Sequence, residues 1–307
     1  MNLRRLKYFI KIVDVGSLTQ AADILHIAQP ALSQQIATLE GEVKQQLLIR
    51  TKQGVTPTNA GKILYQHAQT ILRQCIQAQS ALELSGKGLS GSVSVGLAPG
   101  TAAQQLALPL MKEVQKQHPG IVLYFNENFG TTLSELIMNG RMDMAVIYDS
   151  REIHGLRFLP LMKEHLYFVC PFALAEPVKE ITLQEISEQP LFLPRIYNIM
   201  RKVVDDAFSK EGVSYQVTCE IESQTTLNAA LATGLGCTIM PESAARAMLN
   251  ASDAWMAKIV NPNIQTSLSF CMSDHLPLSE PAEAVKAILL SLMANRTEDN
   301  RPYALVG

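Results

Sequence analysis

The stretch AADILHIAQPALSQQIATLE, residues 21–40, contains two apolar runs of helical spacing on either side of a proline and carries almost no charge. Pro30 fits the first turn of a helix, because the amide hydrogen that proline lacks would have no partner there. The stretch therefore predicts a helix, a tight turn and a second helix. The outward face of the second helix would consist mainly of small, amide and hydroxyl side chains.

The residues on either side of this stretch supply the rest of a small helical core. A first amphipathic helix is predicted to end near Val15. Ser17, followed three residues later by Gln20, has the form of a capping box and predicts the start of the next helix. The helix that begins at Gln29 should bury one apolar stripe, formed by Leu32, Ile36, Leu39 and Val43.

The opposite face of this last helix has the chemistry needed to distinguish DNA bases. Glutamine can bond twice to adenine, serine can bond to several base edges or to phosphate, and a threonine or alanine methyl can meet a thymine methyl. Two short strands around residues 52–54 would form a basic wing beside the DNA backbone. A helical hairpin with a merely solvated face is the alternative. The predicted DNA contacts are Ser17, Thr19, Gln29, Pro30, Ser33, Gln34, Thr38, Arg50, Lys52 and Gln53.

Charge and length agree with a DNA-binding head on a larger body. The chain has 307 residues, enough for two or more folded units. Residues 1–65 contain eight Lys and Arg against four Asp and Glu, whereas the whole chain has a net charge of −2. This asymmetry is typical of a phosphate-binding N-terminal module. Because there is neither a signal-peptide pattern nor a long apolar run, we expect a cytoplasmic protein without a membrane segment.

A long helix is predicted to follow the wing, from Thr58 to about Ser85, a length of about 40 Å. Apolar residues recur along one side of it from Ala60 to Leu82. No local core is expected to cover so long a stripe, which indicates a dimerising helix, with packing against the chain's own body as the alternative. The Gly- and Ser-rich run SGKGLSGS, residues 85–92, is the predicted linker.

The sequence resembles the LysR-type transcriptional regulators. The resemblance lies in LKYFIKIVDVGSLTQAADILHIAQPALSQQIATLE (residues 6–40) and GVTPTNAGKIL (residues 54–64), which carry the winged helix-turn-helix signature of the family, and it extends more diffusely through residues 229–245. Three further stretches, residues 27–42, 45–52 and 276–286, resemble a subgroup of nitrogen-control regulators that act without a coinducer. Many members have basic residues where this chain has Gln34 and Gln53.

The remainder of the chain alternates strand-like runs, among them LYFVCP (residues 166–171), with helical stretches such as 101–117 and 225–235. This alternation predicts two lobes of α/β structure with mostly parallel sheet and a cleft between them. The predicted fold is an α+β multidomain protein with an N-terminal winged helix-turn-helix (1–58), a long linker and dimerisation helix with a hinge (59–91) and a C-terminal α/β two-lobed periplasmic-receptor-like domain (92–307). Lobe I is expected to hold about 92–163 and 267–300, and lobe II about 164–266.

Two turns from strand to helix are candidates for lining an effector cleft. At each turn, free backbone N–H groups and the helix dipole favour an anion, and the resemblance implies that both turns face the cleft. Neither turn has an Arg or Lys nearby in sequence to neutralise a carboxylate. Plain helix capping is the alternative. The candidate residues are Pro99, Gly100, Thr101, Ser223, Gln224 and Thr225.

Catalytic and metal-binding patterns are missing from the sequence. The histidines show no H-E-x-x-H spacing, and there is no P-loop, G-x-G-x-x-G or G-x-S-x-G motif. Cys219 and Cys237 could in principle form a redox pair, but both lie in apolar strand-like runs where buried thiols are usual. We expect all five cysteines to be reduced and buried, with no metal and no cofactor.

The sequence thus predicts a DNA-binding transcription regulator, an activator or repressor, acting on nitrogen-assimilation or related metabolic genes. The expected partners are double-stranded promoter or operator DNA, further copies of the chain in a dimer or tetramer, and RNA polymerase. A small-molecule effector is not expected to be required for DNA binding. The alternative is a small-molecule-binding or enzymatic α/β protein whose helical N-terminus serves only for assembly.

Overall fold

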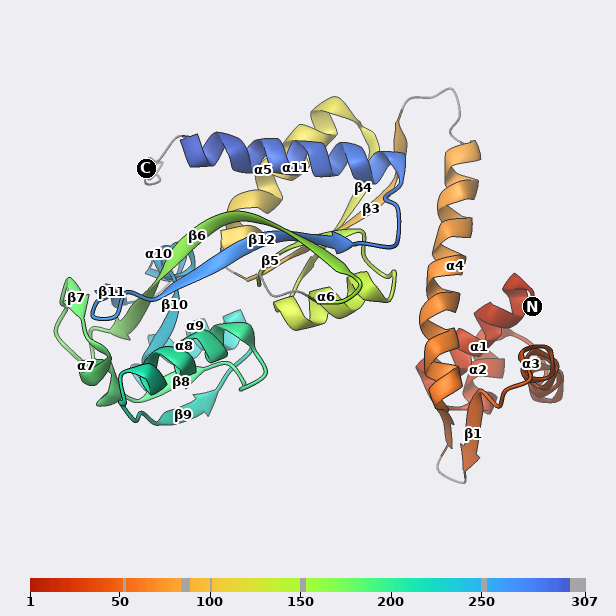
Figure 1. The fold of residues 1–307 in the computed structure, drawn as a ribbon, viewed down its shortest axis with the longest axis horizontal. Coiled ribbons are helices and arrows are strands. Elements are labelled where there is room, and N and C mark those ends of the chain that lie inside the picture. Colours follow the sequence, from red (N-terminus) through yellow and green to blue (C-terminus); the bar gives the residue numbers. More distant parts are fainter. Residues whose placement is uncertain (52–53, 84–88, 100, 150–152, 250–252, 299–307) are drawn as a thin grey trace. The chain divides into compact units, whose positions relative to one another are not determined.

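The computed structural model describes residues 1–51, 54–83, 89–99, 101–149, 153–249 and 253–298. The chain divides into two compact units (Figure 1). Unit 1 holds Met1–Gly91 with Met138–Arg141, and unit 2 holds Ser92–Ile137 with Met142–Gly307. None of the described helices combines the length and the apolar character needed to cross a lipid bilayer.

Unit 1 begins with three helices that share one core. The helices are α1 (Leu3–Val15), α2 (Leu18–Leu25) and α3 (Gln29–Val43). Ala21 and Ala22 are buried and allow α2 to approach its neighbours closely, while Leu32, Ile36 and Leu39 of α3 are fully buried. The predicted helix, turn and helix and the buried stripe of α3 are therefore confirmed.

The wing follows α3 as the hairpin of β1 (Leu48–Thr51) and β2 (Gly54–Pro57). Glu40, near the end of α3, accepts hydrogen bonds from the amides of Leu47 and Leu48 at 2.8 and 3.1 Å, which fixes the start of β1. The hairpin also touches the turn between α1 and α2, where the amide of Val55 donates to the carbonyl of Gly16 at 2.8 Å. The wing is thus hydrogen-bonded at both its start and its return strand.

Helix α4 (Asn59–Glu83) is the predicted long helix, and the Thr58 hydroxyl accepts a hydrogen bond from the amide of Gly61 at its start. The expectation that nothing local covers its apolar stripe is wrong for the first turns. Ala60 and Leu64 pack against the core of unit 1, and Ala68 is fully buried. Further along, Ile76 is 63% exposed and Leu82 is 76% exposed, so the second half of α4 presents apolar side chains without cover from the core that holds the first half.

Unit 2 is built on one eight-stranded sheet and a separate two-stranded sheet, β8–β9. Along the large sheet the order is β4-β3-β5-β12-β6-β11-β7, with β10 also paired to β6. Its strands are β3 (Ser90–Leu97), β4 (Gly120–Glu127), β5 (Met144–Tyr148), β6 (Leu156–Pro171), β7 (Glu180–Ile181), β10 (Thr238–Pro241), β11 (Ala254–Ile259) and β12 (Gln265–Ser273), and the small sheet holds β8 (Leu191–Leu193) and β9 (Val217–Glu220).

The prediction of mostly parallel sheet is wrong. Strand β3 runs parallel to β5, β7 to β11 and β8 to β9, but β5, β6, β10, β11 and β12 are joined by antiparallel pairing. The physical reason is the 16-residue strand β6, of which the sequence pattern revealed only the second half. One end of β6 pairs with β12 and the other with β10 and β11, so this strand runs through both lobes (Figure 1).

The helices of unit 2 are α5 (Thr101–Gln117), α6 (Gly130–Met138), α7 (Leu183–Ser187), α8 (Ile199–Lys210), α9 (Gln224–Ala232), α10 (Glu242–Leu249) and α11 (Glu280–Glu298). One apolar core lies between α6, β5 and the start of β6, around Leu133, Ile137 and Leu156. A larger core lies around Phe168, Phe208 and Trp255. These separate cores give the unit its two lobes.

The contact between α4 and the segment before β1 predicts that alanine substitutions at two glycines have opposite effects on the stability of the protein. A Cβ atom on Gly61 would lie 2.1 Å from the carbonyl oxygen of Leu47, whereas a Cβ on Gly41 in α3 would meet nothing within 4 Å. We expect Gly61→Ala to destabilise the protein by about 1–3 kcal/mol and Gly41→Ala to stabilise it by about 0.5–1 kcal/mol. Urea unfolding followed by far-UV circular dichroism measures both. An unchanged or higher midpoint for Gly61→Ala would contradict this close approach.

Candidate nucleic-acid interface and ligand cleft

The outward face of α3 carries the amide side chains predicted to contact DNA. Gln29, Pro30 and Gln34 are exposed, while Ser33 and Thr38 are half-buried. The Thr38 hydroxyl donates to the carbonyl of Gln34 at 2.9 Å, so its proton is used within the helix. The exposed amides of Gln34 and of Gln29 in the first turn can therefore each offer both a donor and an acceptor to a base.

A hydrogen bond that the sequence analysis did not anticipate links the wing to α3. The Arg50 guanidinium on β1 donates to the Ser33 hydroxyl at 2.8 Å. The two residues are 17 positions apart, and no spacing rule for helices or hairpins connects them. Because a guanidinium has five N–H donors, this bond leaves Arg50 able to bind a phosphate while its position is set by the helix.

The other predicted DNA contacts lie at the start of α2 and in the turn of the wing. The Ser17 hydroxyl accepts a hydrogen bond from the amide of Gln20 at 3.4 Å, the first half of the predicted capping box. Thr19 is exposed in the first turn of α2. Lys52 and Gln53 lie outside the described residues, so the structure places eight of the ten predicted side chains.

Arg5, a basic residue of unit 1, forms an ion pair within the protein. Arg5 donates to Glu42 at 2.7 Å and to the Gln35 side chain at 3.0 Å, and the N-terminal amine lies 3.0 Å from the same Glu42. Hydrogen bonds from the N-terminal amine and from Arg5 hold the pKa of Glu42 below its usual value. The positive charge of Arg5 is thus neutralised locally, which distinguishes it from Arg50.

A pocket between the two lobes of unit 2 is the candidate ligand cleft. It encloses about 710 Å³ of space free of atoms, part of it open to solvent. Pro99, Ser223 and Gln224 of the predicted set line it, whereas Thr225 is exposed and does not belong to the lining. Gly100 lies outside the described residues, and Thr101 begins α5 but its side chain is not described.

The polar side chains at the start of α9 are already bonded within the helix. The Ser223 hydroxyl accepts from the amide of Thr226 at 3.3 Å, and the Gln224 amide donates to the Asn228 side chain at 2.9 Å. Helix capping, the alternative raised from the sequence, describes what Ser223 does here. The start of α9 therefore offers an anion fewer free donors than the sequence pattern suggested.

Glu222, directly before this cap, is the ionisable residue of the cleft that the sequence analysis missed. One of its carboxylate oxygens accepts from the Tyr197 hydroxyl at 2.8 Å, and this bond raises the pKa of Tyr197. The other oxygen is shielded from solvent and has no hydrogen-bond partner among the described residues. No Lys, Arg or His belongs to the described lining. The sequence around Glu222 mixes polar and apolar residues and shows no pattern that predicts an ionisable side chain in the cleft.

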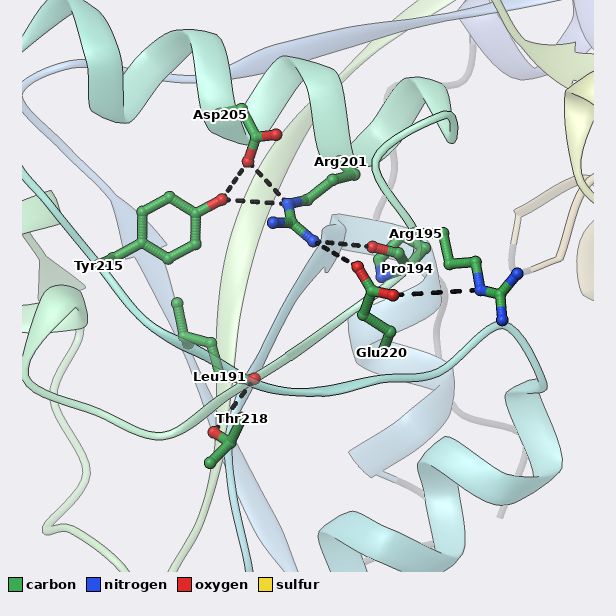
Figure 2. Close-up of polar contacts among 8 residues, drawn as sticks. All are labelled: Leu191, Pro194, Arg195, Arg201, Asp205, Tyr215, Thr218 and Glu220. Carbon is green, nitrogen blue, oxygen red and sulfur yellow. Dashed lines mark hydrogen bonds and ion pairs between the residues drawn. The ribbon is translucent and has the colours of Figure 1, made fainter.

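The arginines of this lobe are held by carboxylates (Figure 2). Arg201 on α8 donates to Asp205 at 2.7 Å and to the carbonyl of Pro194 at 3.1 Å, and it lies 3.6 Å from Glu220. Burial, with the bond to Asp205, raises the pKa of Tyr215 to about 12. Arg195 faces Glu220 at 4.0 Å. This cluster ties α8 to β9.

The cysteines correct one expectation. Cys219 is exposed and Cys75 half-buried, so the five cysteines are not all buried. Cys237 lies opposite Cys170, with the sulfur atoms 3.1 Å apart, and not beside Cys219, because β10 pairs antiparallel with β6. Among the described residues no group of three or more His, Cys, Asp or Glu side chains could hold a metal ion.

Comparison with known proteins extends these observations. Residues 3–62 match the family described as bacterial regulatory helix-turn-helix protein, lysR family, and residues 86–294 match the LysR substrate binding domain. The chain is 53% identical to the nitrogen assimilation regulatory protein nac of Klebsiella aerogenes and 50% identical to that of Escherichia coli (strain K12), over 100% of each chain.

A solved structure shows the same fold at low identity. Full-length CbnR complexed with its target DNA superposes with a TM-score of 0.69 at 21% identity, over 96% of this chain and 99% of that chain. The matched families and the nac relatives are transcription regulators and not enzymes, which removes the enzymatic alternative. The chain therefore belongs to the LysR family of bacterial helix-turn-helix transcriptional regulators.

Proposed function

We propose that the chain binds operator DNA through α3 and the wing and controls genes of nitrogen assimilation. The observation that carries the proposal is the exposed amide face of α3 beside an arginine that is hydrogen-bonded to the same helix. The two nac relatives are nitrogen assimilation regulatory proteins by name, and CbnR was solved with its target DNA.

In this proposal each part of the DNA-binding surface has a separate task. Gln34 reads a base edge, because a side chain amide can form a donor and acceptor pair with adenine. Arg50 binds a phosphate, and its bond to Ser33 sets the distance between backbone contact and base contact. Thr19, Gln29 and Pro30 are exposed and complete the surface, with Ser17 capping α2 and Thr38 bonded within α3.

The remaining parts of the proposal concern assembly and regulation. Residues 1–58 bind DNA, residues 59–91 dimerise, and residues 92–307 form the regulatory domain, so that a dimer or tetramer presents paired copies of α3 to the operator in the cytoplasm. RNA polymerase is the proposed protein partner. DNA binding does not require an effector, because the described cleft lining offers no cation for a carboxylate and Ser223 already caps α9.

The base-reading task of Gln34 is tested by substitution. We expect Gln34→Ala to cost about 1–3 kcal/mol in operator binding and to relax preference at one base pair, because a base contact is lost. Competition binding with operators substituted at each position measures this. Gln45→Ala, an exposed glutamine in the turn after α3, is the control and should bind as the wild type does.

In the same competition assay, we expect Ser33→Ala to change affinity across the operator variants in a different way from Gln34→Ala. Ser33→Ala frees Arg50 from α3, so affinity should fall for all operator variants alike. If Gln34→Ala retained the wild-type preference at every base pair, the assignment of α3 as the reading helix would be wrong.

Dimerisation through α4 is tested on its exposed apolar side. Ile76 is 63% exposed, and a charge placed there should separate the subunits, because a desolvated carboxylate in an apolar seam has no partner. We expect Ile76→Glu to give a species of lower mass in light scattering at micromolar concentration. Gln66→Glu, which adds the same charge at an exposed position of α4 away from both Ile76 and the apolar stripe, should keep the wild-type mass. A wild-type mass for Ile76→Glu would exclude this face from the interface.

A further inference from the structure

The chemistry of the cleft between the lobes favours one class of ligand over another, independently of how the protein binds DNA. Most of the lining is apolar and includes Phe129, Tyr148, Phe192, Met200 and Met240. Apolar and aromatic walls of this kind bind a hydrocarbon body.

The charge of the described lining has one sign. Glu222 is its only ionisable acid or base apart from Tyr148, whose hydroxyl is directed at the Glu164 carboxylate 3.4 Å away. Two guanidinium groups lie nearby but outside the lining: Arg201 faces Glu220 at 3.6 Å, and Arg195 lies 4.0 Å from Glu220 and also beside the Tyr197 hydroxyl. A ligand carboxylate would therefore meet a carboxylate and no cation among the described lining residues, an arrangement that disfavours anions.

Glu222 also has unused hydrogen-bonding capacity. One oxygen accepts from Tyr197, and the other is shielded from solvent without a partner among the described residues. A buried carboxylate oxygen without a donor is an unfavourable arrangement, which a donor on a ligand would relieve. The aromatic side chains of the lining favour a cation in the same space.

We propose that the cleft binds a small apolar molecule that carries a primary amine, with its ammonium group paired to Glu222 and its hydrocarbon body among the aromatic and methionine side chains. The α9 N-terminus does not serve as an anion site in this arrangement, because Ser223 caps it and Glu222 precedes the cap. The ligand class is thus the opposite of the small carboxylates that a helix N-terminus alone would attract.

The test uses three probes of similar size on the full-length protein, with isothermal titration calorimetry. The probes are 2-phenylethylamine, 2-phenylethanol and 3-phenylpropanoate, which differ in a cationic, a neutral and an anionic end. We expect the amine to bind at least ten times more tightly than the alcohol, and the carboxylate to bind no more tightly than the alcohol. This comparison needs no variant, so it does not depend on how a substitution folds.

Two substitutions then locate the binding site. In Glu222→Gln the advantage of the amine over the alcohol should fall to less than threefold, because the charge is lost while the shape is kept. Glu180→Gln removes the same charge from the exposed strand β7 and should leave all three affinities unchanged. Any of three results would overturn the proposal: the carboxylate binds most tightly, none of the probes binds at millimolar concentration, or the preference for the amine survives in Glu222→Gln. Operator binding is measured separately, so failure here leaves the proposed recognition of DNA by α3 untouched.

Discussion

The docking of α3 on α1 and α2 is the constraint on which the DNA-binding surface depends. Leu32, Ile36 and Leu39 are fully buried, so the rotation of α3 about its axis is fixed and its amide face is turned outward. Burying three such side chains contributes several kcal/mol, about 1.5–3 kcal/mol each before the cost of ordering the chain. A rotation of α3 by one residue would expose part of this stripe and bury the residues that meet DNA.

Hydrogen bonds carry this constraint from α3 into the wing. Glu40 binds two amides at the start of β1, Gly16 accepts from Val55 on β2, and Arg50 donates to Ser33. Each of these bonds fixes a different point of the hairpin. The wing is consequently positioned by the same helix that reads the bases, which keeps backbone contact and base contact in register on a duplex.

The cleft of unit 2 rests on a different constraint, the continuity of β6 across both lobes. The Glu164 side chain on this strand receives hydrogen bonds from Ser243 of α10 and from Tyr148, which lines the cleft. Ligand chemistry is set by loop residues such as Glu222, and the fold shared with other LysR proteins does not dictate it. A receptor-like fold can therefore be kept while the charge of its cleft changes.

Local patterns explain which features could be predicted from the sequence. The helices around Pro30 and the hairpin around residues 52–54 follow from spacing and turn chemistry, and the bounds of α5 coincide with the predicted 101–117. The first half of β6 was missed because Arg157, Lys163 and Glu164 interrupt its apolar pattern. Three features depend on residues that are distant in sequence and meet only in the folded protein, so no spacing rule predicts them. They are the bond between Arg50 and Ser33, the contact of Cys237 with Cys170 and the place of Glu222 in the cleft.

The proposed function depends above all on recognition of the operator by α3 in the ligand-free protein. The most direct measurement is the ratio of dissociation constants for an operator fragment and a scrambled fragment of equal length, at fixed physiological salt, with protein freed of small molecules by refolding. We expect a ratio of about 10³ or more, as in other specific DNA-binding proteins. A ratio below about ten that rises to this level only after a carboxylic metabolite is added would contradict it.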